Sequence, residues 1–365
     1  MEQFVAYKKM KLLFLNTNIG YGGASKMLIW VANQCAKAGH DVTLLTYRDS
    51  SVYQNISLKV KHVHQQLEDI NGKGNIFKSI FWLRKYIKKE DFDVAIAFLS
   101  PSQLRLHFAC FGIGIKTLFS HRGDPYSKSK VFKAKLINRL NNWAFTSADA
   151  FVFQTFQAMR YYGDTIINKS VVIPNPINPL KRTESREGYI FKRIVNVGRL
   201  DIWQKRQDLL IEAFKKICNE YPDYILEFYG DGPDEEKLRI LAKDCPQIRF
   251  MGKTSNVVDA IQNATMFVLS SDFEGIPNAL LEAMSLGLPC ISTDCSPGGA
   301  ALLIQNGNNG ILTKRGDADD LAKAMKFMLD NPKQAESMGI EALKVIETFS
   351  EDRIKQQWLN IIERL

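Results

Sequence analysis

The sequence predicts an α/β protein made of two doubly wound units that follow one another along the chain, and three observations lead to this prediction. In the first 50 residues, a strand-like apolar run, a glycine loop, a helical pattern and a second strand follow in order. This order is the start of a parallel βαβ arrangement. Residues 171–179, VVIPNPINP, contain three prolines and are therefore neither helix nor central strand. After this break the strand and helix patterns begin again.

The elements of the first unit are predicted from their periodicity. MKLLFLN is an unbroken apolar run typical of a buried strand, and TNIGYGG after it is a loop. From Ala24 to Cys35 the apolar residues recur with the i, i+3, i+4 spacing of an amphipathic helix, which Gly39 ends. The other elements expected here are strands at 41–47, 93–100 and 150–155, a strand and polar loop at 116–125, and helices at 76–89 and 128–149.

The second unit alternates in the same way. Strands, with the turns that follow them, are expected at 193–200, 224–232, 248–252, 265–271 and 289–293. Helices are expected at 208–221, 234–245 and 256–264, after Pro277, at 317–331, and at 349–365 with Ser350 as the N-cap. Ligands bind beyond the carboxyl ends of the strands in such sheets, here in the cleft expected between the two units.

Composition excludes several classes of protein. The 365 residues are 45% hydrophobic and 24% charged, which is ordinary for a globular chain long enough for two domains. The longest apolar runs, such as Ala95–Leu99, fall far short of the roughly 20 residues that span a bilayer. The N-terminus has no signal-peptide pattern and the six cysteines form no C-x-x-C pair, so we expect a cytosolic protein with reduced thiols.

Charge is unevenly distributed along the chain. Residues 1–180 contain 24 Lys and Arg against 11 Asp and Glu, whereas residues 181–365 contain 24 against 28. The basic half predicts an anionic partner, which is nucleic acid, anionic lipid or a phosphorylated ligand. Two of its predicted helices interleave basic and apolar residues, as helices on anionic bilayers do, although a solvated helix packed on the sheet has the same pattern. The first contains Phe77, Ile80, Phe81 and Trp82 with Lys78, Arg84, Lys85, Lys88 and Lys89, and the second contains Lys128, Lys130, Lys133, Lys135 and Arg139.

Two glutamates lie on either side of an expected helix start in SSDFEGIPNALLEAMSLGLPCIS. Glu274 is expected on the loop beyond a strand, and Glu282 about one turn into the helix. Pro277 is well tolerated near the first helical position, and the free N–H groups from Ile276 to Ala279 make an anion site. Two carboxylates beside an anion site suit a diphosphate ligand that has hydroxyl-rich groups at both ends. The alternative is an ordinary helix start with incidental acidic residues.

Other polar loops follow strands of the second unit. Arg199 and Lys205, in VGRLDIWQK, are two cations that can neutralise a diphosphate. Thr254 lies in MGKTSNV, a turn after a strand where backbone groups can meet a base. YGDGP is interpreted as a structural turn and TDCSPGGA as a flexible glycine loop. The two cations also fit a solvated basic loop, and MGKTSNV and TDCSPGGA each have a purely structural interpretation as well.

Nearly the whole chain resembles a retaining glycosyltransferase of family 4 with the GT-B fold. The resemblance is carried by GYGGASKMLIWVANQCAKAGHDVTLLT, VIPNPI, VGRL followed by QKRQDLLIEAF, YGDGP and FEGIPNALLEAMSLGLPCISTDC. It implies two Rossmann-like domains facing across a cleft, 1–175 for the acceptor and 176–348 for the donor, with a helix at 349–365 that crosses back to the first domain. It also implies transfer of a hexose or N-acetylhexosamine from a UDP-sugar to a glycan acceptor, with no cofactor and no bound metal.

The same resemblance assigns roles to residues. Arg199 and Lys205 become diphosphate ligands and catalytic cations, Glu282 a ribose ligand, and Glu274 a catalytic neighbour of the donor sugar and α-phosphate. Negative charge that develops on the leaving β-phosphate would be stabilised by these cations and by the helix N-terminus. The expected donor-binding set is Gly22, Gly23, Arg199, Lys205, Thr254, Glu274, Gly275, Ile276, Pro277, Asn278, Ala279 and Glu282.

The loop FSHRGDPYS follows a predicted strand, and the resemblance implies that it meets the donor sugar. Related enzymes that move N-acetylhexosamines or galactose often have Ser-Glu-Arg-Asn-Asp-Pro, whereas this chain has His121 and Gly123 in place of Glu and Asn. His121 is expected to be catalytic, through a hydrogen bond to a sugar hydroxyl or through its backbone carbonyl, or else to be a solvent-facing loop residue. This departure leaves the donor sugar open. Arg122 and Asp124 are either acceptor-side or structural.

The leading prediction is a cytoplasmic enzyme, peripheral on the inner face of the membrane, that extends a polyprenyl-diphosphate-linked glycan in surface polysaccharide synthesis. One alternative is a synthase or phosphorylase of the same fold with a small soluble acceptor. A second is a non-catalytic nucleotide or glycan binder, which the presence of all four charged site residues of the second unit disfavours. A nucleic-acid protein has no supporting motif, and a dehydrogenase is disfavoured because GYGGAS lacks the G-x-G-x-x-G spacing.

Overall fold

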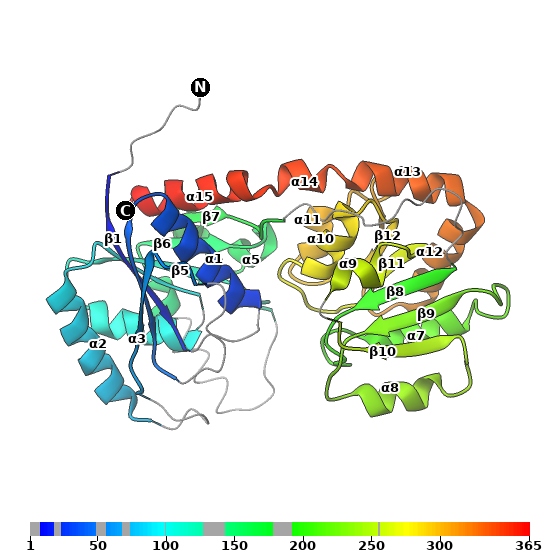
Figure 1. Ribbon diagram of the computed structural model, residues 1–365, viewed down its shortest axis with the longest axis horizontal. Coiled ribbons are helices and arrows are strands. Elements are labelled where there is room, and N and C mark those ends of the chain that lie inside the picture. The colour runs from blue at the N-terminus through cyan, green and yellow to red at the C-terminus, as the bar shows by residue number, and fades with distance from the viewer. Residues whose placement is uncertain are drawn as a thin grey trace. The chain divides into compact units, whose positions relative to one another are not determined.

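The computed structural model describes residues 8–17, 23–48, 56–67, 74–98, 100–126, 143–177, 192–254 and 256–365. The chain divides into two compact units, one formed by Met1–Ile173 with Asp352–Leu365 and the other by Pro174–Glu351 (Figure 1). Each unit is a parallel sheet with helices on both faces, so the predicted α/β class with two doubly wound units is confirmed.

In the described part of the first unit, seven parallel strands lie in the order β3-β2-β1-β4-β5-β6-β7. The order reverses between the neighbours β1 and β4, which is the topological switch point of a doubly wound sheet. The strands are β1 (Lys11–Asn16), β2 (Asp41–Thr46), β3 (Val60–His64), β4 (Val94–Ala97), β5 (Lys116–His121), β6 (Ala150–Phe153) and β7 (Ser170–Val172).

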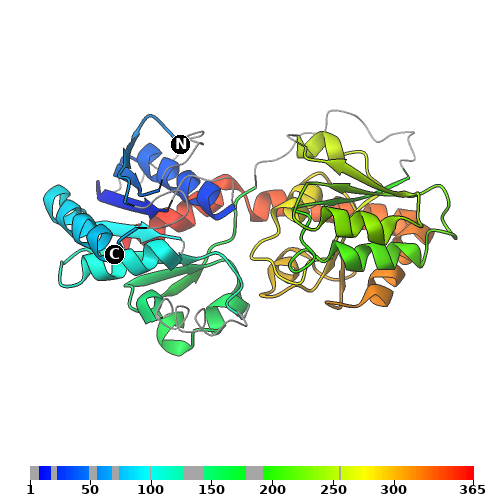
Figure 2. The same cartoon turned by 90° about the horizontal axis from the view of Figure 1, so that it is seen from below.

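Alternate side chains of β1 pack on opposite faces of this sheet. Leu12 and Phe14 pack with α1 (Gly23–Lys37) and α15 (Glu351–Glu363), whereas Leu13 and Leu15 pack with α2 (Ile76–Glu90) and α3 (Ser100–Cys110). The helices α2 and α3 lie side by side (Figure 2). Two short helices complete the described part of this unit, α5 (Phe156–Arg160) and α6 (Asp164–Ile167).

The C-terminal helix α15 packs in the first unit, so the predicted return of this helix to the first domain is seen in the structure. Trp358 is fully buried, and its ring stacks 5.3 Å from that of Phe98 at the end of β4. Ile354 and Ile362 enter the same cluster. Removal of a buried Trp ring costs roughly 3–5 kcal/mol, so this helix contributes substantially to the stability of the first unit.

The second sheet has the order β10-β9-β8-β11-β12-β13, with the switch point between β8 and β11. Every strand pair is parallel. The strands are β8 (Arg193–Val197), β9 (Ile225–Tyr229), β10 (Ile248–Gly252), β11 (Met266–Leu269), β12 (Cys290–Thr293) and β13 (Ile311–Thr313).

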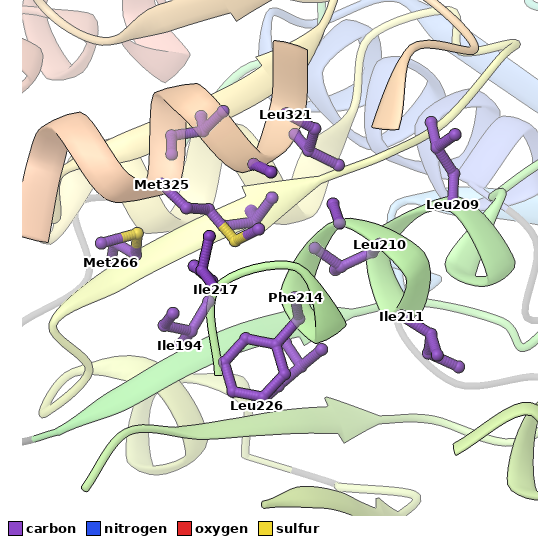
Figure 3. Close-up of a cluster of buried hydrophobic side chains, with 14 of the residues drawn as sticks. Ile194, Leu209, Leu210, Ile211, Phe214, Ile217, Leu226, Met266, Leu321 and Met325 are labelled. Atoms are coloured by element: carbon purple, nitrogen blue, oxygen red, sulfur yellow. The ribbon is translucent and has the colours of Figure 1, made fainter. Parts of the chain in front are cut away.

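Two layers of helices cover the second sheet. On one face lie α7 (Gln207–Lys215), α8 (Glu235–Ala242) and α12 (Ala318–Asp330), and on the other α9 (Val257–Ile261), α10 (Asn278–Ser285) and α11 (Gly299–Leu303). Figure 3 shows the first of these cores, where Ile194, Leu226 and Met266 of the strands meet Phe214 of α7 and Met325 of α12. The helices α13 (Pro332–Ala342) and α14 (Val345–Thr348) then lead to α15.

Several elements differ from the sequence prediction. The first residues of VVIPNPINP belong to the edge strand β7, and the division between the units falls after Ile173. Nine of the described elements were not predicted: β3, β7, β13, α3, α5, α6, α11, α13 and α14. Helix α11 begins inside TDCSPGGA, so the expectation of a flexible loop there is wrong from Gly299 onward. Most of the basic helix expected at 128–149 lies outside the described residues, which resume with a short helical turn at 143–146.

Candidate active site

The switch point of the second sheet brings together two charged residues that are far apart in the sequence. Lys205 lies at the end of the loop after β8, and Glu274 lies on the loop after β11. The Lys205 ammonium group forms an ion pair with Oε1 of Glu274, and the two side chains are 20% and 9% exposed. Ser271 donates a hydrogen bond to the same carboxylate oxygen at 2.9 Å. Burial, together with the nearby negative charge of Glu274, raises the pKa of the Cys295 thiol to about 12, so this neighbour stays protonated.

Arg199 is placed by a hydrogen-bonded loop. Its backbone carbonyl accepts a hydrogen bond from the amide of the buried Gln207 at 2.8 Å, and the Gln207 amide oxygen accepts from the Asp201 N–H at 3.2 Å. The Arg199 guanidinium group pairs with Asp201, and its side chain is 60% exposed. Arg199 is therefore an accessible cation at the same edge of the sheet as Lys205.

Helix α10 begins immediately after the Glu274 loop. Its first residue is Asn278, as predicted, and its N-cap residue Pro277 makes no side-chain cap bond to the first turn. The amide oxygen of Asn278 accepts a hydrogen bond from Asn175 at 2.7 Å. Glu282 is the fifth residue of the helix and is half-buried. The backbone N–H groups at the start of α10 are therefore placed to bind an anion. Glu274 precedes them in the sequence, and Glu282 follows about one turn into the helix.

Close contacts between glycine loops shape this edge of the sheet. A Cβ atom on Gly299 would lie 1.6 Å from the carbonyl oxygen of Gly275, next to Glu274. A Cβ atom on Gly230 would lie 2.0 Å from the carbonyl oxygen of Gly198. The segment TDCSPGGA is therefore packed against the Glu274 loop, and its two adjacent glycines are the sequence feature that permits this close approach.

His121 is the last residue of β5 in the first unit and is surrounded by aromatic rings. The centroids of Phe145, Phe153 and Tyr162 lie 5.9, 6.1 and 5.6 Å from its ring. Burial, with a smaller effect from the charge of Arg122, lowers the pKa of His121 from 6.5 to about 4, so the imidazole is neutral at neutral pH. The expectation of a solvent-facing histidine is wrong, because the side chain lies among these rings and its Nδ1 atom is buried.

Arg122 has a structural environment. Its Nε atom donates to Ser120 Oγ at 2.9 Å, and its guanidinium group lies over the rings of Phe98 and Trp358 at 4.8 and 5.2 Å. These contacts join β5 to α15. Asp124 accepts a hydrogen bond from the Tyr126 N–H at 2.9 Å and so closes the turn after His121.

The remaining predicted site residues are more dispersed. Thr254 follows β10, two strands from β8, and its hydroxyl group donates to the carbonyl of Asn256 at 2.8 Å. Gly23 is the exposed first residue of α1, whereas Gly22 lies outside the described residues. The predicted residues that also lie outside the described part of the chain are Lys128, Lys130, Lys133, Lys135 and Arg139.

Helix α2 carries an exposed aromatic and basic surface, which we call the α2 aromatic face and define by Phe77, Lys78, Phe81 and Lys85. Phe77 is 79% exposed and Phe81 is 61% exposed, and the Lys85 ammonium group lies 4.6 Å from the centre of the Phe81 ring. Ile80 and Trp82, predicted to belong to this surface, pack against the core instead.

The described residues lack two features that were looked for in the sequence, a metal-ligand cluster and a membrane-spanning helix. No group of three or more His, Cys, Asp or Glu side chains there is placed to hold a metal ion. No helix there is both long and apolar enough to cross a bilayer.

The fold and this site define a doubly wound α/β protein with a switch point suited to an anionic ligand. Residues 21–180 match the family model described as Glycosyltransferase Family 4, and residues 191–331 match the model described as Glycosyl transferases group 1. The chain therefore belongs to the family 4, group 1 glycosyltransferases, which have the GT-B fold.

Individual relatives are similar over the full length. An uncharacterized glycosyltransferase of Haemophilus influenzae is 26% identical over 363 residues, which cover 96% of this chain and 99% of the relative. The GalNAc-alpha-(1->4)-GalNAc-alpha-(1->3)-diNAcBac-PP-undecaprenol alpha-1,4-N-acetyl-D-galactosaminyltransferase of Campylobacter jejuni is 25% identical over 365 residues, 97% of this chain and 98% of the relative. The Anabaena protein Alr3699/HepE, solved with UDP and with UDP-glucose, has TM-scores of 0.80 at 18% and 17% identity, covering 98% of this chain and 100% of that one.

Proposed function

We propose that this glycosyltransferase is a retaining enzyme that moves a hexose or N-acetylhexosamine from a UDP-sugar to a lipid-diphosphate-linked glycan. The observation that carries the proposal is the meeting of Lys205 and Glu274 at the switch point, directly before the uncapped start of α10. The complexes of HepE with UDP and UDP-glucose support the choice of donor. The name of the Campylobacter relative, which specifies a PP-undecaprenol-linked glycan, supports the choice of acceptor.

In this proposal the donor lies along the carboxyl edge of the second sheet. Lys205, Arg199 and the first N–H groups of α10 contact the diphosphate, and Glu282 accepts hydrogen bonds from the ribose hydroxyl groups. Glu274 lies beside the sugar and the α-phosphate, and Thr254 marks the end where the base binds. Gly23 is proposed as a further phosphate contact, and Gly22, proposed with it, lies outside the described residues. His121, neutral at neutral pH, contacts the sugar.

The reaction breaks the bond between the anomeric carbon and the β-phosphate oxygen. The acceptor hydroxyl attacks the anomeric carbon on the face that the phosphate leaves, which retains the configuration. The hydroxyl proton passes to the departing phosphate oxygen, and Lys205 and Arg199 stabilise the charge that develops there. These two cations supply the stabilisation that a metal ion supplies in other phosphate sites, so we propose a metal-independent enzyme.

The α2 aromatic face supports work at a membrane. Exposed Phe side chains enter the boundary between headgroups and acyl chains, and each nearby Lys or Arg adds about 1 kcal/mol on an anionic surface. We therefore propose that the protein is cytoplasmic, peripheral on the inner face of the cell membrane, and that it acts in surface polysaccharide or glycoconjugate synthesis.

A transfer assay tests this proposal. Purified protein is incubated with radiolabelled nucleotide sugars and a bacterial lipid extract, and the Lys205→Ala variant is the control. Label that enters the lipid phase from a UDP-sugar, and is lost in the variant, supports the donor and the acceptor class. Label only in a water-soluble product would favour a synthase with a small acceptor, and nucleotide binding without any transfer would favour a binding protein.

A further inference from the structure

The two loops that carry Lys205 and Glu274 are joined by hydrogen bonds that involve their backbones. Ser270 Oγ donates to the carbonyl of Lys205 at 2.9 Å, and the Asp272 N–H donates to the carbonyl of Gln204 at 2.9 Å. The amide of Gln204 donates to the carbonyl of Phe273 at 3.1 Å. These bonds hold the two loops side by side at Gln204 and Lys205, before the first residue of α7.

Arg206, the residue after Lys205, has an unusual backbone. Its φ is +50°, in the left-handed region, where a non-glycine residue costs roughly 1–2 kcal/mol. Only one other non-glycine residue in the described chain has a positive φ, and that residue, Asp91, ends helix α2. Arg206 is the N-cap residue of α7 and makes no side-chain cap bond to the helix. Backbone strain of this kind persists where the surrounding contacts impose it.

The side chain of Arg206 provides such contacts. Its Nη1 atom lies 3.0 Å from Oδ2 of Asp272, on the Glu274 loop, and its Nε atom lies 3.1 Å from Oδ1 of Asp208, on its own helix. The Arg206 and Asp272 side chains are 26% and 19% exposed. Burial opposes the charged form of Arg206, but the hydrogen bonds to Asp208 and Asp272 outweigh it and raise the pKa of its guanidinium group.

We infer that Arg206 is a positioning residue, whose ion pair with Asp272 locks the Lys205 loop to the Glu274 loop and thereby sets the spacing of the site. The planar guanidinium fork bonds two carboxylates at once, one on each side of the turn, which a lysine ammonium group does with less geometric constraint. Asp272 in turn depends on this cation, because its Oδ1 atom is buried and has no hydrogen-bond partner among the described residues. The role at the donor site rests on the proposed function.

Four variants separate positioning from general stability. Arg206→Gly relieves the backbone strain and removes the ion pair, and Asp272→Asn removes the ion pair alone. Arg206→Lys keeps the charge. Asp208→Asn is the matched control, because it removes the partner of Arg206 that lies on the same helix and leaves the bond between the loops intact.

The first measurement is the rate at which acetic anhydride modifies Lys205 in the free protein, followed by mass spectrometry. We expect about tenfold faster modification in Arg206→Gly and Asp272→Asn, a smaller rise in Arg206→Lys, and the wild-type rate in Asp208→Asn. Melting temperatures are recorded in parallel, and an increase in labelling without a matching loss of stability identifies positioning. Unchanged labelling in both Arg206→Gly and Asp272→Asn, or an equal rise in Asp208→Asn, would overturn the inference.

The second measurement is the affinity for UDP by calorimetry, which connects the inference to the donor site. We expect Arg206→Gly and Asp272→Asn to bind UDP about tenfold more weakly than Asp208→Asn does. Faster Lys205 labelling with unaltered UDP affinity would uphold the positioning role and count against the proposed donor site. The two ideas therefore fail in distinguishable ways.

Discussion

Lys205 and Glu274 are 69 positions apart in the sequence and form an ion pair at the switch point of the second sheet. Each charge is largely withdrawn from water, so each is compensated by the other in the ligand-free protein. A diphosphate that binds here competes with Glu274 for the Lys205 ammonium group. In the proposed function, the pair would hold the cation in place before the donor binds, and donor binding would give Glu274 a new environment.

Substitutions on the two sides of this pair should have different effects. Lys205→Met removes the cation, and we expect the UDP affinity and kcat/KM to fall by about 10²-fold or more, because the charge on the leaving phosphate loses its partner. Glu274→Gln removes the competitor, so UDP affinity should stay the same or rise while kcat falls. Steady-state kinetics and calorimetry measure both.

Lys216 provides the control for the Lys205 substitution. Its ammonium group pairs with Asp319 at 2.6 Å on the exposed surface of the same unit. Lys216→Met should leave kinetics and UDP affinity within about twofold of wild type, since exposed ion pairs contribute little. Parallel losses of turnover and affinity in Glu274→Gln and Lys205→Met would contradict the division of roles.

Glu282 should act at the ribose end of the donor. We expect Glu282→Gln to raise the donor KM several-fold with little change in kcat, because the carboxylate contacts a part of the donor that does not react. Comparison of UDP with 2′,3′-dideoxy-UDP sharpens the test. Wild-type protein should lose affinity for the dideoxy compound, whereas Glu282→Gln should bind the two compounds almost equally. A similar preference for UDP in both proteins would rule out the ribose contact.

The contact between Gly299 and Gly275 should be essential to the Glu274 loop. A Cβ atom on Gly299 would lie 1.6 Å from the Gly275 carbonyl oxygen, so Gly299→Ala must displace one of the two loops. We expect at least about tenfold lower transfer activity and a melting temperature lower by several degrees. Gly114→Ala is the control, since its Cβ atom would meet no atom within 4 Å. Normal kinetics in Gly299→Ala would show that the loop tolerates the displacement.

The sequence can predict that the loops carrying Lys205 and Glu274 lie at the same edge of the second sheet. Periodicity identifies the strands that become β8 and β11, and a doubly wound order makes them neighbours at the switch point. Residues that follow these strands must then meet at one edge. The ion pair itself, the bond from Ser271 and the strained backbone of Arg206 depend on atomic distances between loops, which periodicity does not encode.

Other parts of the structure could not be predicted for a different physical reason. Helix α3 buries Ser102, Gln103 and Arg105 together with apolar residues, so its sequence lacks a clear apolar stripe. Inside the unit, Arg105 donates hydrogen bonds to the Ser79 and Tyr47 hydroxyl groups and to the carbonyl of Pro101, and periodicity does not predict such contacts. Strand β3 is an edge strand, and its pattern is mixed because only Val60 is buried.

His121 should make the stability of the first unit depend on pH. Its pKa is lowered from 6.5 to about 4 in the folded protein, mainly by burial. Between these values the unfolded chain binds a proton that the folded protein does not, so the free energy of unfolding falls as the pH falls through this window. The contribution of neutral His121 is complete above pH 6.5 and lost on approach to pH 4.

Comparison of wild type with His121→Gln isolates this contribution. Urea unfolding at pH 7 and pH 5 should show a smaller loss of stability in the variant, by on the order of 1–2 kcal/mol. His40, His62 and His107 also have lowered pKa values, but they are present in both proteins and cancel in the difference. An identical pH dependence in the two proteins would mean that His121 is hydrated in solution.

The α2 aromatic face should bind anionic membranes. Phe77 and Phe81 are exposed on one helix beside Lys78 and Lys85, so insertion of the rings and attraction of the ammonium groups act on the same surface. We expect the Phe77→Ser/Phe81→Ser variant to sediment with anionic vesicles at least about tenfold more weakly than wild type, because each ring loses more than 1 kcal/mol of burial. Ile340→Ser is the control, since Ile340 is 62% exposed on α13 in the other unit. Binding to wholly zwitterionic vesicles as strong as to anionic ones, or equal binding by all three proteins, would remove the membrane from the proposed function.

The electrostatic part of membrane binding has its own test. Binding that weakens with salt in the wild-type protein, and is lost in Lys78→Glu/Lys85→Glu, would assign this part to the α2 aromatic face.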